Sequence, residues 1–174
     1  VISTSMRDKG LDYGINFGLT MEFIVRLAKE LGEDGLLASY LLSRDVRELQ
    51  LIGQQIYPAS CLNFSIATAL AERSMPNPEL RDCLCKHLFD RNTMLPQYAL
   101  AWLTQARYKD LSTIAYTTLA RHFTFGYKFA HKSWEQCLLR CAFKTLDEDA
   151  PYMTSEQRAA LLMLKRWGRS DKNI

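Results

Sequence analysis

Two residue pairs in the sequence have the spacing at which neighbouring side chains on a helix could bind a metal ion together. Cys83 precedes His87 by four residues, and Cys137 precedes Cys141 by four. Such pairs lie on one helix face, and each could supply half of a tetrahedral zinc site. The chain has no CxxC motif and no second ligand pair at a matching distance. Burial of the cysteines as small apolar side chains is therefore the favoured interpretation, and we predict no metal.

Basic residues are concentrated in the third quarter of the chain. Residues 91–144 hold eight Lys and Arg against two Asp and Glu, whereas residues 1–90 hold nine against 12. A polyanion could bind such a segment, and a solvated helix surface is the alternative interpretation. We predict that seven of the eight basic residues bind nucleic acid: Arg107, Lys109, Arg121, Lys128, Lys132, Arg140 and Lys144.

An aromatic stretch accompanies the basic residues. Residues 122–129 read HFTFGYKF, and Trp134 follows. Rings interleaved with His and Lys could stack on bases or hold a cation. Because aromatic side chains dominate the burial of cores, we expect this stretch to form the packed seam between two helix pairs. Trp102 and Trp167 lie on apolar helical stripes, and we predict that both belong to the core.

Composition limits the class of protein. A chain of 174 residues with 48% hydrophobic and 24% charged residues predicts one domain, residues 1–174, with a buried core. No apolar run approaches the roughly 18 residues of a membrane helix, and no charged start precedes an apolar signal core. We therefore expect a cytoplasmic protein. Motifs for dinucleotides, P-loop phosphates and zinc proteases are absent, so we predict no cofactor.

Helical periodicity runs through the whole chain and predicts an all-α protein. In residues 19–31 apolar side chains recur at helical spacing, with Thr20 suited to cap the helix and Gly32 suited to end it. Ser43 or Asp45 is expected to cap the helix over 46–57. The same pattern predicts further helices over 36–42, 59–73, 78–90, 95–107, 110–125, 132–145 and 154–167.

Short links between helices of about 12 residues indicate stacked helix pairs. The helix end at Leu41 and Leu42, followed by residues 45–51, aligns with Trp102 and Leu103 followed by residues 110–116. This loose repeat favours an α-solenoid of antiparallel helix pairs over a compact bundle. A solenoid offers a concave face, which suits an extended partner.

The N-terminal third resembles a known family. Residues 5–19 read SMRDKGLDYGINFGL, and an apolar helix, the sequence DVREL at 45–49 and Tyr57-Pro58 follow. This order resembles the HEAT-like-repeat DNA alkylation repair proteins over residues 3–58. Better-known members are alkylpurine DNA glycosylases that hold duplex DNA on the concave face of the solenoid and use no metal or cofactor. The resemblance implies an α-solenoid of HEAT-like repeats and duplex DNA as the partner.

The catalytic pattern of that family is not found in this chain. Glycosylases of the family carry a Trp-Trp-Asp-x-Val-Asp type of run after the Tyr-Pro and an Arg on a later repeat. Here residues 77–87 read NPELRDCLCKH without Trp, and residues 111–116 supply no Arg. Asp82 and Glu79 are the carboxylates that could substitute, but for Asp82 an exposed ion pair with Arg81 or Lys86 is the favoured interpretation. Without aromatic walls and a placed acid the chemistry should be lost.

Some glycines and charged residues within the segment that resembles the family also have structural explanations. Gly14 and Gly18 suit positions of positive φ or close backbone approach. Glu48 suits the first turn of a helix, and Arg47 can reach a carboxylate of a neighbouring repeat. We therefore expect a DNA-binding protein of the alkylation repair type that has no catalytic residues. A protein-interaction scaffold and a divergent alkylpurine glycosylase are the alternatives.

Overall fold

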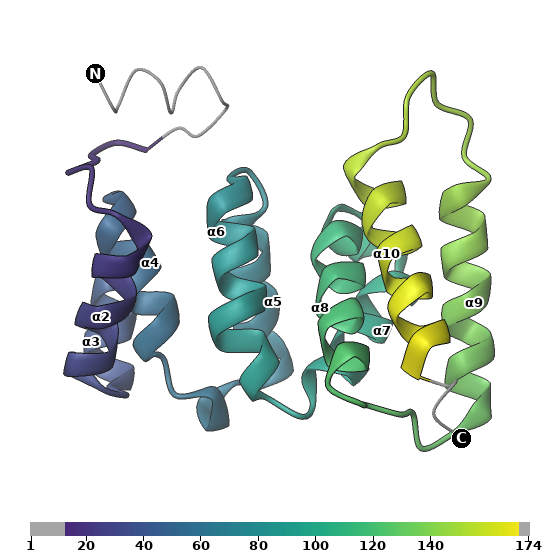
Figure 1. Cartoon of the computed structure of the whole chain (residues 1–174), viewed down its shortest axis with the longest axis horizontal. Coiled ribbons are helices and arrows are strands. Elements are labelled where there is room, and N and C mark those ends of the chain that lie inside the picture. Colours follow the sequence, from purple (N-terminus) through teal and green to yellow (C-terminus); the bar gives the residue numbers. More distant parts are fainter. Residues whose placement is uncertain (1–12, 171–174) are drawn as a thin grey trace. The chain divides into compact units, whose positions relative to one another are not determined.

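The computed structural model describes residues 13–170, and every regular element in this range is a helix (Figure 1). The one β-type pairing among the described residues is an isolated bridge between Ile15 and Val46. The all-α prediction is confirmed. No described helix is long and apolar enough to cross a membrane. Residues 5–12, which carry part of the family resemblance, lie outside the described residues.

The chain divides into two compact units, residues 1–92 and residues 93–174. Each unit is described by itself below. The single domain over residues 1–174 stays a prediction.

The first unit is built around α4 (Arg47–Ile56), which contacts α2 (Met21–Leu31), α3 (Gly35–Leu42) and α6 (Pro78–Cys83). α5 (Phe64–Ser74) contacts α6 in turn. Apolar residues of these helices form the core, with the following fully or almost fully buried: Ile24, Ala38, Leu51, Ile52 and Ile56. α4 is therefore the central helix of this unit, against which α2, α3 and α6 pack.

The ends of α2 are formed as the sequence predicts, whereas the start of α4 is not. The Thr20 hydroxyl accepts a hydrogen bond from the Phe23 amide, and Gly32 ends the helix with φ of 72°. α4 has Val46 as its N-cap and no side-chain cap. The backbone carbonyl of Asp45 instead accepts a hydrogen bond from the Ile15 amide. The expectation that Ser43 or Asp45 caps α4 is wrong, because the incoming segment pairs with this position.

The two glycines before α2 hold the backbone geometry expected of them. Gly18 has φ of 78°, a conformation that costs other residues free energy. A Cβ atom on Gly14 would collide with the Asp45 carboxylate and lie 3.0 Å from the Asp45 carbonyl oxygen. Both positions let the segment before α2 run against the start of α4.

Two predicted helices are divided in the structure. The predicted helix over 59–73 consists of a 3₁₀ turn at Ala59–Cys61 and then α5. The predicted helix over 78–90 consists of α6, a π-helical segment at Leu84–Leu88 and a 3₁₀ turn at Phe89–Arg91. A π-helical turn rotates the following side chains out of α-helical register.

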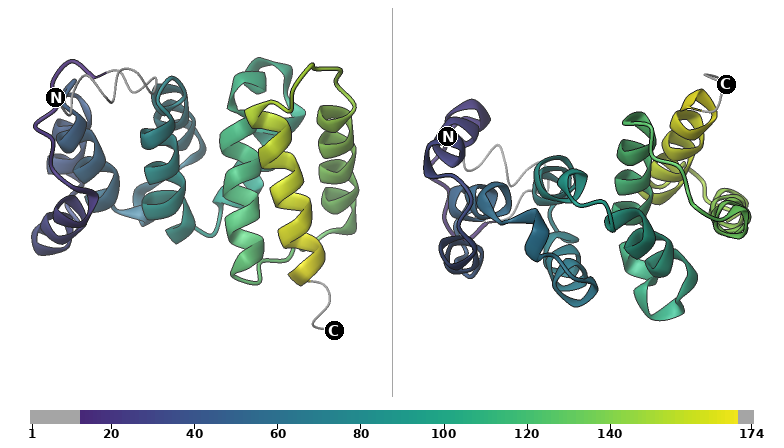
Figure 2. Two further views of the ribbon diagram at one scale, coloured as in Figure 1. Left: turned by 45° about the horizontal axis from the view of Figure 1, so that its top comes forward. Right: turned by 90° about the horizontal axis from the view of Figure 1, so that it is seen from below.

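The second unit consists of two helix hairpins stacked on each other. α7 (Leu95–Thr104) contacts α8 (Ser112–Thr124), and α9 (Lys132–Leu146) contacts α10 (Ser155–Ser170). Across the stack α7 contacts α9, and α8 contacts α10. The left view of Figure 2 shows α8, α10 and α9 side by side. A 3₁₀ segment, η4 (Ala106–Leu111), joins α7 to α8.

The aromatic stretch fills the seam of this stack, as expected. Phe123 and Phe129 are buried, and their rings meet edge to face at 5.9 Å. Trp167 of α10 stacks on Phe123 at 5.3 Å with 9° between the planes. Trp102 is fully buried, whereas Trp167 is only half-buried. Phe125 is 70% exposed and is the ring of this stretch that the seam does not use.

Candidate nucleic-acid interface

All seven predicted nucleic-acid-binding residues lie in the second unit. The unit of residues 93–174 holds 12 Lys and Arg against seven Asp and Glu. Arg121, at the end of α8, is half-buried, and the other six are exposed. They come from η4, the link between α8 and α9, and α9: Arg107, Lys109, Lys128, Lys132, Arg140 and Lys144.

α9 carries three of these residues on a broad stripe. Lys132, Arg140 and Lys144 are separated by multiples of four residues, and all three are exposed. Each step of four residues turns by about 40° around a helix, so the stripe turns by about 120° from Lys132 to Lys144 while it extends roughly 18 Å along the axis. A stripe of this length can meet several phosphates of one strand.

Three of the seven residues come together at one cavity. Lys109, Arg140 and Lys144 line a cavity of about 580 Å³ between η4, α8 and α9. Two carboxylates, Glu148 and Glu156, line it as well. The cavity therefore places three cations near two anions.

The wall of this cavity is a set of buried hydroxyl groups. The Tyr116 and Thr145 hydroxyls lie 3.0 Å apart, and Thr145 donates to Glu156 at 3.4 Å. Burial is the main cause that raises the pKa of Tyr116 to about 12. Tyr116 is therefore a neutral hydrogen-bonding group at physiological pH.

The Cys141 thiol at this cavity is not activated. Cys137 and Cys141 both line the cavity, and the Cys141 thiol donates to the Leu103 carbonyl at 3.7 Å. Burial and the neighbouring Cys137 raise the pKa of Cys141, against the opposing effect of Arg140 and Lys144. The thiol form is inert as a nucleophile or metal ligand. Within residues 13–170, no group of three or more His, Cys, Asp or Glu is arranged to hold a metal ion.

The other four predicted residues lie apart from the 580 Å³ cavity. The Arg107 guanidinium covers the Tyr108 ring at 4.5 Å. Arg121 lines a smaller cavity of about 160 Å³ together with Arg166 of α10. Lys128 and Lys132 line neither cavity. The structure thus places three of the seven residues at the 580 Å³ cavity, one at the smaller cavity and three at neither.

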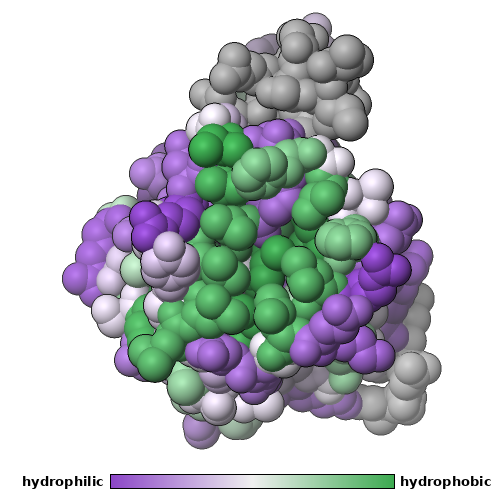
Figure 3. Space-filling view, turned by 90° about the vertical axis from the view of Figure 1, so that its left-hand side faces the viewer, coloured by the Kyte–Doolittle hydropathy of each residue, from purple (hydrophilic) through white to green (hydrophobic). Residues whose placement is uncertain are grey.

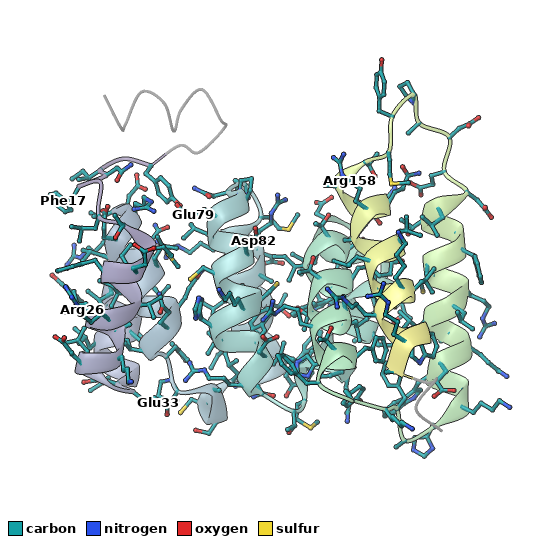
Figure 4. All side chains as sticks on the ribbon, in the orientation of Figure 1. Phe17, Arg26, Glu33, Glu79, Asp82 and Arg158 are labelled. Carbon is teal, nitrogen blue, oxygen red and sulfur yellow. The ribbon has the colours of Figure 1, made fainter. Side chains whose placement is uncertain are left out.

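Sequence reasoning missed the basic residues of α10. Residues 145–174 balance five basic against five acidic residues, and this balance concealed their distribution. Asp147, Glu148 and Asp149 precede α10, whereas four cations on α10 are exposed: Arg158, Lys165, Arg166 and Arg169. Figure 4 shows Arg158 in the first turns of this helix. Counting charge by predicted helix would have found them.

In the first unit, the Arg47 and Glu48 pair is structural, as expected. The Arg47 side chain is only 5% exposed and holds the Glu79 carboxylate through two of its nitrogens, with Nε 2.8 Å from Oε2. Arg47 also donates to the Leu19 carbonyl at 2.8 Å, and Tyr13 donates to Glu79 at 2.6 Å. These contacts join the segment before α2 to α4 and α6.

Glu48 fixes the same segment through its backbone. Its carboxylate accepts the amides of Phe17, Gly18 and Leu19 at 3.0 to 3.2 Å. Burial acts to raise the pKa of Glu48, but these hydrogen bonds and Arg47 together lower it below its usual value. The carboxylate is therefore ionised and fully engaged.

The two carboxylates considered for glycosylase chemistry line a second cavity. Glu79 and Asp82 border a cavity of about 560 Å³ together with Lys86 and His87. Glu79 faces α4 and Arg47 (Figure 4). Asp82 is exposed and forms no ion pair among the described residues, so the expected ion pair with Arg81 or Lys86 is wrong. Burial is the main cause that raises the pKa of Cys83 to about 12, so its thiol stays protonated.

Comparison of the chain with protein-family models, with curated proteins and with solved structures gives no match.

The first unit also exposes apolar side chains around α2 and α3. Figure 3 shows them gathered in one area on this side of the unit. The exposed apolar residues of this part of the chain include Phe17, Phe23, Leu31, Leu36 and Tyr40. Arg26 covers the Phe23 ring at 4.9 Å, and Arg44 covers the Tyr40 ring at 4.3 Å. Figure 4 shows Phe17 and Arg26 pointing away from α4.

Proposed function

We propose that this chain is a DNA-binding protein of the HEAT-like-repeat DNA alkylation repair type, and that duplex DNA binds to the basic surface of residues 93–174. The observation that carries the proposal is the exposure of Lys132, Arg140 and Lys144 along the length of α9. Contacts from such a stripe to phosphates do not depend on the base sequence. We expect binding of similar strength to duplexes of any sequence.

The helix arrangement supports the repeat class. In the second unit the hairpin of α7 and α8 stacks on the hairpin of α9 and α10. In this stack α7 contacts α9, and α8 contacts α10. Stacking of this order is what HEAT-like helix pairs require. The ion pair between Arg47 and Glu79 likewise joins α4 to α6 in the first unit.

Glycosylase activity has weaker support. Glu79 is occupied by Arg47 and Tyr13, and the aromatic walls expected around a catalytic acid are missing from residues 77–87. Asp82 is the one carboxylate of the pair that is exposed and unpaired among the described residues. Release of free alkylated base from treated DNA, abolished by Asp82→Asn, would establish the activity. Absence of release excludes it.

Fluorescence anisotropy with a labelled blunt duplex tests DNA binding. Replacing Lys132, Arg140 and Lys144 together by Gln should weaken binding equally for unrelated sequences. It should also reduce the slope of log K against log salt by up to about 0.9 for each lost phosphate contact. Arg121→Ala with Lys128→Ala should act in the same direction.

Arg26→Gln with Lys29→Gln is the matched control, because these exposed cations lie on α2 of the first unit. The control should bind as tightly as the unchanged protein. A protein that ignores the duplex at low salt, or a control that loses as much affinity as the triple variant, would exclude the proposal.

The apolar area on α2 and α3 favours a second function, binding of another protein. Leu36 is 88% exposed and Phe17 is 70% exposed, and a helical stack with an apolar outer face calls for a covering partner. Leu36→Ser with Phe17→Ser should abolish capture of a protein partner that survives nuclease treatment. Equal capture by the variant would contradict this function.

A further inference from the structure

The 580 Å³ cavity beside α9 is lined by three cations and two carboxylates. Going along α9, the chain presents Arg140, then Lys144, then Glu148 just past the helix end, over roughly 12 Å. Lys109 joins the cations from η4, and Glu156 joins Glu148 from α10. A ligand in this cavity would meet cations at one part and carboxylates at another.

The charged groups of this cavity form no ion pairs within residues 13–170. This holds for the three cations and for the two carboxylates. Glu156 receives one hydrogen bond, from Thr145. Its remaining acceptor positions are available, because an ionised carboxylate can accept about four hydrogen bonds.

The part of the cavity wall formed by hydroxyl groups is held in place by packing and hydrogen bonds. Tyr116 is fully buried, and its hydroxyl is linked to Glu156 through Thr145. Ser112, one turn earlier on α8, donates to the Lys109 carbonyl. These contacts fix the position of Glu156 and of the η4 backbone that carries Lys109. A preorganised wall lowers the cost of binding a small ligand.

We propose that this cavity binds a phosphate monoester that carries hydroxyl or amino donors at its far end, which is the chemistry of a nucleoside monophosphate. Lys109, Arg140 and Lys144 hold the phosphate through charge-assisted hydrogen bonds. Glu148 and Glu156 accept the donors of the sugar or base. The volume lies within the range of small-molecule sites, about 300 to 1,000 Å³.

The carboxylates make the site selective. A second or third phosphate would lie close to Glu148 and Glu156, and like charges placed together oppose binding. A monophosphate is therefore preferred over a triphosphate. The inference goes beyond duplex binding and does not depend on it.

Isothermal titration of the whole protein tests the proposal, with adenosine 5′-monophosphate, adenosine, adenosine 5′-triphosphate and inorganic phosphate as probes. We expect the monophosphate to bind more tightly than each of the other three. Arg140→Gln and Lys144→Gln should each weaken it by about tenfold or more, because hydrogen bonds to charged groups contribute at this level. Glu156→Gln should weaken the monophosphate and leave inorganic phosphate unchanged.

Lys128→Gln with Lys132→Gln is the matched control, because both cations are exposed, on or just before α9, and line no part of the cavity. This variant should bind the monophosphate normally while losing affinity for a blunt duplex with 5′-hydroxyl ends. Failure of duplex binding alone is thereby distinguished from failure of the cavity. Thermal melts of each variant verify that it is folded.

The nucleotide could be free or could be the end of a strand. A 5′-phosphorylated single strand that binds at least tenfold more tightly than the monophosphate identifies a strand end, and the reverse order identifies a free nucleotide. The proposal is overturned if the monophosphate gives no binding at millimolar concentration, if adenosine binds equally well, or if the control variant loses as much monophosphate affinity as Arg140→Gln.

Discussion

Arg47→Ala should be the most damaging single substitution in the first unit. The Arg47 guanidinium makes two hydrogen bonds to Glu79, one to the Leu19 carbonyl and one to Glu48 at 3.2 Å. Its removal leaves Glu48, which is 2% exposed, without its nearby cation, and leaves Glu79 facing α4 unpaired. Breaking a buried ion pair from one side costs about 3 to 5 kcal/mol.

That loss is comparable to the whole stability of a small domain, about 5 to 15 kcal/mol. Urea denaturation followed by circular dichroism measures the change in the free energy of unfolding. Hydrogen exchange locates it, because amides of α2 and α4 should lose protection while those of α8 keep theirs. Glu79→Gln, which keeps the shape and one acceptor, should cost less and provides a variant that still folds.

Arg47→Met combined with Glu79→Leu should recover part of the stability lost in Arg47→Ala, since both charges are then absent. Arg26→Ala is the control: its guanidinium is exposed and covers the Phe23 ring, which contributes about 1 kcal/mol or less. If Arg47→Ala costs no more than Arg26→Ala, the ion pair does not hold the segment before α2.

Three further outcomes follow from the contacts. Gly53→Ala should destabilise the protein by about 1 to 3 kcal/mol in urea, because its Cβ would lie 2.9 Å from Leu42 Cγ. Stability should fall as the pH is lowered below about 4.3: the pKa of Glu48 is lowered on folding, so its contribution is present above the unfolded pKa and is lost as pH falls through the folded one. Phe123→Ala should cost about 3 to 5 kcal/mol and shift the fluorescence of Trp167, which stacks on that ring.

Each outcome has its own control. Gly35→Ala should be tolerated, because the nearest atoms to its Cβ belong to Pro58, 3.6 Å away. Glu48→Gln should flatten the pH dependence, and an unchanged pH profile in that variant would assign the acid transition to other groups. Phe125→Ala, at a ring that is 70% exposed, should leave the melting temperature within a few degrees of the original.

The helices could be predicted because their apolar residues recur at helical period, and the predicted bounds agree with the structure to within a few residues for most of them. The π-helical segment at Leu84–Leu88 could not, since the register shift it causes falls near the end of the predicted helix and leaves too few following residues to reveal a change of period. Thr20 and Gly32 gave correct ends for α2, because both act on their own helix. The start of α4 at Val46 could not be predicted, because it depends on the segment around Ile15, which is distant in the sequence.

The candidate interface could be predicted in composition but not in arrangement. The sequence indicated that Arg47 reaches a carboxylate, and only the fold identifies Glu79, 32 residues later. In the same way, the sequence placed seven cations in one segment. Which of them meet at the cavity depends on the rotation of α9 against η4, and this selects Lys109, Arg140 and Lys144 while leaving Lys128 outside.

The unequal use of charge in the two units leads to a last prediction. In the first unit, buried or partly buried carboxylates such as Glu48 and Glu79 are matched by Arg47. In the second unit, Arg140 and Lys144 have no ion-pair partner among the described residues, and such unmatched charge repels itself at low ionic strength. A bound polyanion removes this repulsion.

A duplex present at 100 times its Kd should therefore stabilise the second unit by about 2.7 kcal/mol. Hydrogen exchange should show the added protection in α8, α9 and α10 at low salt and its loss at high salt. Protection that persists at high salt would mean that the stabilisation does not come from these charges.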